Sequence, residues 1–179
     1  WKRYRGFDRA GASQVIQVWD TAFKEKTTAD YSVCSTWAKT PQGVYVLDVY
    51  RERLEFPDLK RKARDLFALW QPGVVLVEDK ASGQSLVQEL GRPDEQDPIR
   101  WPRLPVIAIK VDSDKVSRAA AVTPYVEAGM VSLPEDAPWV SDWIEEHAKF
   151  PLASHDDQVD TTSMALVRLM AAAQNIWLG

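Results

Sequence analysis

The sequence predicts an α/β domain in which a mixed sheet is flanked by helices on both faces. Two observations predict this fold class. Three segments rich in β-forming residues follow one another near the start of the chain and are joined by turn residues, which indicates an antiparallel meander. Short apolar segments then alternate with segments of helical periodicity, which indicates further strands that join the sheet in parallel and helices that cover it.

The meander is predicted element by element from the first fifty residues. Residues 1–13 form a polar lead-in, and the first strand is predicted at Val15–Asp20, which is apolar and ends in a carboxylate. Tyr31–Lys39 alternates in polarity and predicts the second strand. The turn sequence TPQG at 40–43 separates it from a third strand that begins at Val44. A short turn between two strands favours a hairpin, which the first strand extends.

The rest of the chain alternates helices and strands. A helix is predicted to begin near Pro57, because proline is favoured in a first turn, and its apolar stripe is Leu59, Ala63, Leu66, Phe67 and Trp70. The following elements are a strand at 74–79, a helix at 82–90, a proline-rich loop at 91–105, a strand at 106–110, a helix at 115–128, an extended segment at 130–134, a helix at 139–150 and a last helix that ends near 173. The near-continuously apolar strands at 15–20, 74–79 and 106–110 are expected to be central and buried on both faces.

Length and composition indicate one globular domain over residues 1–179, with 45% hydrophobic and 27% charged residues. The chain has no apolar run of about 18 residues and no visible signal peptide, so we expect no membrane association. The single Cys34 excludes an internal disulfide and fits a reducing compartment. The net charge of −4 argues against a surface that is basic throughout, but it allows a local basic groove for nucleic acid.

Acidic residues gather at the predicted strand ends and at the last helix, which is predicted to start within an acidic cluster. Asp20 ends the first strand, and Glu78 and Asp79 end the fourth, while the stretch SHDDQVDTTSMAL from Ser154 holds three further carboxylates, Asp156, Asp157 and Asp160. Capping of the last helix and ordinary strand termination are the alternative explanations. The carboxyl ends of central strands are also where functional groups collect in open α/β sheets.

Metal binding is the chemistry that such a cluster favours. Two His and one Cys make a zinc site improbable, so oxygen ligands and Mg²⁺ or Mn²⁺ are expected. Two ions about 3.5–4 Å apart activate water and stabilise the leaving oxygen of a phosphodiester. Asp160 lies three residues after Asp157 and four after Asp156, so spacing alone does not choose between them. His155 is an outer ligand, a hydrogen-bond donor to a ligand or a simple loop residue.

Basic residues near these acids are candidate phosphate contacts: Lys24, Lys26, Lys80, Lys110, Lys115 and Arg118. The alternative for each is a solvated surface charge, and Ser82 and Gly83 after Lys80 have helix capping as their alternative role. Among the eight Trp residues, Trp19, Trp37 and Trp70 are predicted to lie in the core rather than to stack on bases.

Four segments of the chain resemble, in order, a known family. VWDTA (18–22), VEDKASG (77–83), DKVSRAAAVTPYVEAGMVSLP (114–134) and HDDQVDTTSMAL (155–166) are similar to nuclease domains of tailed-phage terminase large subunits. The resemblance covers about residues 15–170 and implies an RNase H-like, retroviral-integrase-like fold. It also implies a metal-dependent endonuclease that cuts concatemeric double-stranded viral DNA during genome packaging.

The resemblance places catalytic and metal-binding roles on Asp20, Glu78 and Asp157, with two Mg²⁺ or Mn²⁺ ions. Asp160 is expected to be an auxiliary ligand, and Asp156 is a further candidate. A terminase ATPase motor, the portal and the small terminase subunit are the implied partners besides DNA. No GxxxxGK[ST] motif occurs, so we expect a C-terminal domain excised from the motor. The implied location is the host cytoplasm, outside the mature virion.

Two other functional hypotheses stay open at this point. The first is another RNase H-like nuclease, a Holliday-junction resolvase or a ribonuclease H. The second is a non-catalytic interaction domain of a packaging machine, in which the acids bind a structural ion.

Overall fold

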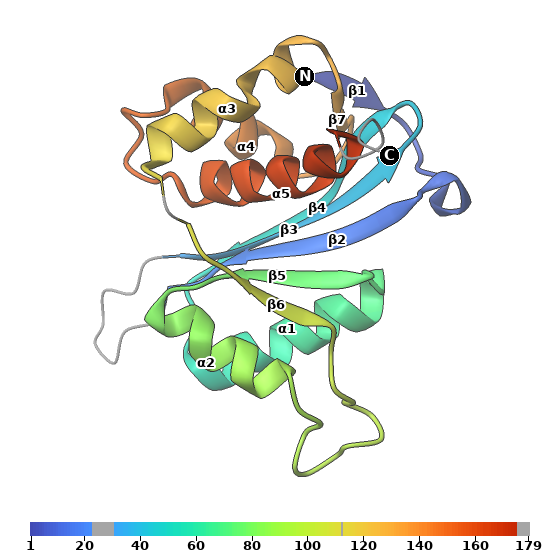
Figure 1. Ribbon diagram of the computed structural model, residues 1–179, viewed down its shortest axis with the longest axis vertical. Helices are drawn as coiled ribbons and strands as arrows, with labels where there is room; N and C mark the ends of the chain where they lie inside the picture. Colours follow the sequence, from blue (N-terminus) through green and yellow to red (C-terminus); the bar gives the residue numbers. More distant parts are fainter. Residues whose placement is uncertain (23–30, 112, 175–179) are drawn as a thin grey trace.

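A sheet lies between two layers of helices (Figure 1). The computed structural model of the chain describes residues 1–22, 31–111 and 113–174. Helices α1 and α2 cover one face of the sheet, and α3, α4 and α5 cover the other. The predicted fold class, a mixed α/β sheet with helices on both faces, is confirmed.

The sheet has seven strands in the described part of the chain, in the order β1-β7-β4-β3-β2-β5-β6. Their bounds are β1 Lys2–Tyr4, β2 Gln14–Asp20, β3 Ser32–Thr40, β4 Gly43–Glu52, β5 Val74–Glu78, β6 Val106–Ile109 and β7 Val131–Pro134. β3 pairs antiparallel with both β2 and β4, which confirms the predicted meander. The pairs β2–β5, β5–β6, β4–β7 and β1–β7 are parallel.

The first four α-helices of the described residues begin within one residue of their predicted starts, and the last begins inside the acidic cluster, as expected. Their bounds are α1 Phe56–Trp70, α2 Ala81–Leu90, α3 Lys115–Glu127, α4 Val140–Lys149 and α5 Asp157–Gln174. A short 3₁₀ turn, Arg9–Gly11, precedes β2. No helix of the described residues is long and apolar enough to cross a membrane.

The two faces of β2 and β5 carry different halves of the core. Because side chains alternate along a strand, Ile16 and Val18 of β2 pack with Leu166 and Leu169 of α5, whereas Trp19 packs with the α1 side. β5 divides in the same way, and Leu76 lies on the α5 side. This alternation decides which way the last residue of each strand faces.

Two sequence predictions about the sheet need correction. The strand predicted at Val106–Lys110 is not central: β6 is an edge strand, and Ile107 is 49% exposed. A short apolar segment has the same composition in a central strand, with two neighbouring strands, as in an edge strand, with one. Composition alone therefore predicted the wrong position for this strand. The lead-in 1–13 contains β1, which pairs with β7 at the opposite edge, although its exposed Lys2 and Arg3 give no strand pattern.

Candidate functional site

The parallel pairing of β2 and β5 brings Asp20 and Glu78 to one end of the sheet. Each is the last residue of its strand, one position beyond the paired residues Trp19 and Val77. By alternation both side chains face the α5 layer, as Val18 and Leu76 do. Asp20 is 4% exposed and Glu78 is 5% exposed, so two carboxyl groups are buried beside each other.

The lysine that follows β5 lies between these two carboxylates. Lys80 Nζ is 3.2 Å from Asp20 Oδ1 and 2.5 Å from Glu78 Oε2. Its place is fixed by the close approach of α2 to the end of β5. A Cβ on Gly83 would lie 2.0 Å from the carbonyl oxygen of Glu78, so only glycine fits there.

Ser82 fastens the start of α2 to the end of β2 and does not cap its own helix. Its hydroxyl donates to the carbonyl oxygen of Thr21 at 2.6 Å, and the Thr21 hydroxyl donates to Ser82 Oγ at 3.1 Å. The N-cap residue of α2 is Lys80, which makes no capping hydrogen bond with its side chain. The capping alternative for Ser82 is therefore wrong.

The first turn of α5 adds more carboxylates and meets two cations from α3. Lys115 Nζ is 2.6 Å from Asp156 Oδ1 and 2.8 Å from Asp160 Oδ2. Arg118 donates to Asp160 Oδ1 and, at 2.6 Å, to the carbonyl oxygen of Ser113. Asp160 is only 2% exposed, so its charge is buried between these cations.

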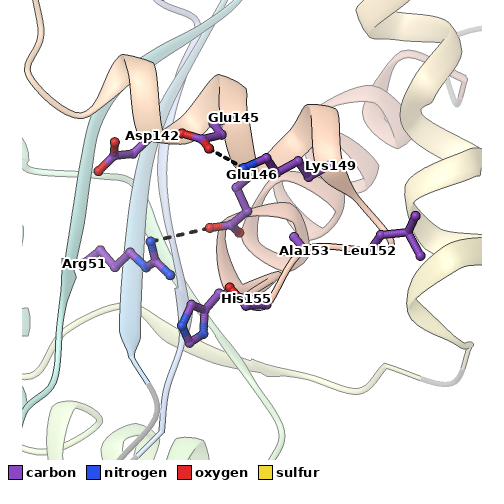
Figure 2. Close-up of a pocket in the computed structure, with 9 residues that line it drawn as sticks. Arg51, Asp142, Glu145, Glu146, Lys149, Leu152, Ala153 and His155 are labelled. Atoms are coloured by element: carbon purple, nitrogen blue, oxygen red, sulfur yellow. Dashed lines mark hydrogen bonds and ion pairs between the residues drawn. The ribbon is translucent and has the colours of Figure 1, made fainter.

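The acids of α5 do not cap the helix, because Glu146 does. Glu146 extends from α4, and its Oε1 accepts hydrogen bonds from the backbone N–H groups of Gln158 at 2.7 Å and Val159 at 3.3 Å. Its Oε2 accepts from Gln158 Nε2 at 2.7 Å and lies 3.7 Å from Arg51 Nη1, a pair that Figure 2 displays. No side chain of the cluster accepts a hydrogen bond from a backbone N–H of α5 in the described residues, although Asp157 and Asp160 do lie in its first turn, where acidic residues are favoured. Asp157 Oδ2 is a buried oxygen with no hydrogen-bond partner among the described residues.

The electrostatics of the cluster are those of a site short of positive charge. The pKa of Asp20 is raised to about 8, first by burial and then by the charges of Glu78 and Asp160, while the charge of Lys80 acts in the opposite direction. The pKa of Asp157 is also raised, first by burial and then by the charge of Glu146. A bound cation would reverse both effects.

A hollow of about 490 Å³ opens over these groups, and Asp20, Lys80, Lys115, His155, Asp156 and Asp157 are among the residues that line it. A second hollow of about 330 Å³ lies beside it and shares His155 (Figure 2). In the described part of the chain, no three Asp, Glu, His or Cys side chains converge closely enough to hold one metal ion. The ammonium groups of Lys80 and Lys115 lie between the carboxylates instead.

The profile of the family described as "Terminase RNaseH-like domain" matches residues 17–169. The chain belongs to this family. The resemblance seen in the four sequence segments is thus confirmed, and so is the RNase H-like fold that it implied. No curated protein sequence matches the chain.

Solved structures of terminases share the fold of this terminase RNase H-like domain at low sequence identity. The large terminase of a thermophilic bacteriophage is 12% identical, with a TM-score of 0.66 over 94% of this chain and 43% of that one. The zinc-bound large terminase nuclease of the thermophilic phage G20c is 20% identical, with a TM-score of 0.58, covering 83% of this chain and 80% of that one. The manganese-soaked, inhibitor-bound terminase nuclease domain of human cytomegalovirus is 12% identical, with a TM-score of 0.57, covering 88% and 83%.

The structure brings most of the predicted site residues together at the carboxyl ends of β2 and β5. Asp20 and Glu78 are adjacent, and Asp156 and Asp157 line the hollow above them. Asp160 lies close enough for its charge to raise the pKa of Asp20.

The predicted phosphate contacts differ in how they are placed. Lys80 and Lys115 line the hollow, but both are paired with carboxylates, as is Arg118. Lys24 and Lys26 lie outside the described residues.

Sequence reasoning missed Glu146 and Arg51. Glu146 lies in register with the buried α4 residues Val140 and Trp143, and an acidic residue on a buried stripe is a signal for a buried hydrogen-bonding role. Arg51 follows from no such pattern. It stacks on the ring of Tyr31 at 4.2 Å, and that ring in turn contacts His155 edge-on.

Proposed function

We propose that this chain is the nuclease domain of a terminase large subunit and hydrolyses phosphodiester bonds of double-stranded viral DNA during packaging. The observation that carries the proposal is the buried pair Asp20 and Glu78 at adjacent parallel strand ends, with α5 carboxylates over the same hollow. Membership of the terminase RNase H-like family supports it. A buried cluster of like charges destabilises the fold unless a cation compensates it.

The donor set fits hard divalent cations. All candidate ligands are carboxylates, and three of their buried oxygens, Glu78 Oε2, Asp157 Oδ2 and Asp160 Oδ2, have no hydrogen-bond partner in the described residues apart from the lysine ion pairs described above. We propose that Asp20, Glu78 and Asp157 hold two Mg²⁺ or Mn²⁺ ions and that Asp160 is auxiliary. The zinc and manganese named for the G20c and cytomegalovirus domains agree with a divalent site. When bound, such ions lower the pKa of a water and stabilise the leaving oxygen.

The side chains of this domain supply the rest of the site. Asp20 and Glu78 are held rigidly, because each ends a strand that is paired within the sheet. Gly83 and Ser82 fix α2 against these strand ends, and Glu146 fixes the first turn of α5. The acids are therefore positioned by backbone structure rather than by flexible loops, as a site that must align two oxygens of one phosphate requires.

Phosphate contacts are proposed for the cations around the hollow: Lys24, Lys26, Lys80, Lys115 and Arg118. Their charge offsets the acidic edge that DNA must approach. The chain spans 43% of the first of the large terminases compared above, so an ATPase motor, the portal and the small subunit are proposed as partners of the whole protein, in the host cytoplasm.

Cleavage of supercoiled plasmid tests the proposal. The wild-type domain, Asp20→Asn and the control Asp65→Asn, which alters an exposed acid on α1, are compared with Mg²⁺, Mn²⁺ or EDTA. We expect metal-dependent nicking and linearisation by the wild type and the control, and none by Asp20→Asn. Equal cleavage by Asp20→Asn would exclude this site, and preference for a four-way junction or an RNA–DNA hybrid over duplex DNA would favour another RNase H-like nuclease.

A further inference from the structure

We infer that Lys80 and Lys115 compete with the two divalent cations for the same pairs of carboxylates, so that binding of each cation releases one lysine into the hollow above. The inference rests on the proposed function, because it assumes that these carboxylates bind metal. It adds two residues that set how tightly, and under what conditions, the site takes up its ions.

The first position at which a lysine and a cation would compete lies between the ends of β2 and β5. One ammonium group, Lys80 Nζ, is in contact with an oxygen of Asp20 at 3.2 Å and with an oxygen of Glu78 at 2.5 Å. These oxygens belong to two of the three proposed metal ligands. An ion held by both carboxylates would have to occupy the position of the ammonium group.

The second such position lies at the start of α5, where another lysine ammonium group again contacts two carboxylates. Lys115 Nζ contacts an oxygen of Asp156 at 2.6 Å and an oxygen of Asp160 at 2.8 Å. The site thus contains two ammonium groups, each between two carboxylates. Asp160 is the proposed auxiliary ligand and lies one helical turn from Asp157, so a cation held by Asp157 and Asp160 would meet the Lys115 ammonium group at Asp160.

The lysines are the mobile partners at both positions. The side chains of Lys80 and Lys115 are 44% and 42% exposed, whereas those of Asp20, Glu78 and Asp160 are 5%, 7% and 3% exposed, and that of Asp156 is 33% exposed. Because each lysine side chain is almost half exposed and its stem is flexible, its ammonium group can return to water at little cost. A divalent ion brings twice the charge to the buried carboxylates of Asp20, Glu78 and Asp160, which are held in place by the sheet and by α5.

Arg118 is different and is expected to stay. Its side chain is 13% exposed, and besides Asp160 it donates to the carbonyl oxygen of Ser113 at 2.6 Å. Release would leave that buried guanidinium without partners. The hollow of about 490 Å³ is lined by both Lys80 and Lys115, so the released ammonium groups would lie where a DNA phosphate approaches.

Chemical labelling of lysine amines tests the release without any cleavage assay. The wild-type domain is stripped with EDTA, titrated with MgCl₂ and acetylated briefly, and modification at each lysine is measured by mass spectrometry. The matched control is Lys60, which also lies between two carboxylates, at 3.4 Å from Glu89 and 3.7 Å from Asp94 on the other face of the sheet. We expect labelling of Lys80 and Lys115 to rise several-fold as the metal binds, and labelling of Lys60 to stay constant.

Variants of Lys80 separate competition from simple charge repulsion. Calorimetric titration with Mg²⁺ should give a lower Kd for Lys80→Met than for the wild type, and no change for Lys60→Met. Lys80→Arg keeps the charge but offers a two-pronged donor that holds two carboxylates more firmly, so its Kd for Mg²⁺ should rise. Equal Kd values for Lys80→Arg and the wild type would overturn the inference.

The outcomes also separate this inference from the proposed function. If Mg²⁺ binds and the domain cuts DNA, but labelling of Lys80 and Lys115 does not change, the competition is refuted and the nuclease stands. If calorimetry detects no Mg²⁺ or Mn²⁺ binding and no metal-dependent cleavage occurs, both are refuted.

Discussion

Removing the carboxylate of Glu146 should loosen the helix that carries the α5 acids. Glu146→Ala deletes the acceptor for the backbone N–H groups of Gln158 and Val159 and for the side-chain amide of Gln158. All three donors are buried, and Glu146 itself is 7% exposed. We therefore expect a large loss of stability from a change that touches no proposed ligand.

The size of the loss follows from the hydrogen bonds. Leaving a buried donor unpaired costs about 1–3 kcal/mol, and losing a helix N-cap costs about 1 kcal/mol. Water can reach part of this end of α5, because the adjacent hollow opens beside Glu146 (Figure 2). We predict a decrease of about 3 kcal/mol in the free energy of unfolding, which is a substantial part of the 5–15 kcal/mol typical of a domain.

Urea denaturation measures this change, and two variants serve as controls. Glu145→Ala removes the neighbouring exposed carboxylate, whose partner is Lys149 one turn away, and should leave the free energy of unfolding almost unchanged, because water screens this pair. Glu146→Gln keeps the acceptor oxygen for the two N–H groups and should cost less than Glu146→Ala. A loss below about 1 kcal/mol for Glu146→Ala would refute the account of how α5 is positioned.

Three further predictions concern the strand ends and the core. Gly83→Ala should destabilise the domain by about 3 kcal/mol in urea titrations and impair cleavage, because its Cβ overlaps the backbone of Glu78 at 2.0 Å. Because the pKa of Asp20 is raised by burial to about 8, the unfolded chain loses this proton at lower pH than the native chain. With EDTA, stability should therefore fall as pH rises from 4 to 8, and Asp20→Asn, followed by thermal melts, should abolish that part of the slope. Burial lowers the pKa of His147 to about 4, so stability should fall as pH drops from about 6.5 towards 4, and His147→Gln should flatten this decline in the same melts.

Local patterns were enough to predict most of the fold. The meander, α1 and the starts of the later helices follow from alternation, turn residues and periodicity, all of which act over a few residues. The edge position of β6 depends on which strands pair, and the run VIAI contains no information about its neighbours. The pairing of the polar β1 with β7 depends on contacts across more than a hundred residues in the same way.

The site was predictable to the extent that it follows from the sheet. Asp20 and Glu78 meet because parallel strands end at the same edge, and that rule can be applied to a sequence. The ion pairs of Lys80 and Lys115 could not be predicted, because a lysine beside an acid can face water or the acid with equal ease. The role of Glu146 depends on how α4 packs against α5, which no single segment specifies.

Anomalous diffraction from crystals of this domain soaked in MnCl₂ tests the central claim most directly. The claim predicts manganese peaks at the edge formed by Asp20, Glu78 and the α5 acids, one beside the Asp20–Glu78 pair and one beside the first turn of α5. Crystals of Asp20→Asn soaked in the same way should lose the first peak. Wild-type protein that cuts DNA with Mn²⁺ yet has no manganese at this edge would contradict the claim and place the catalytic site elsewhere.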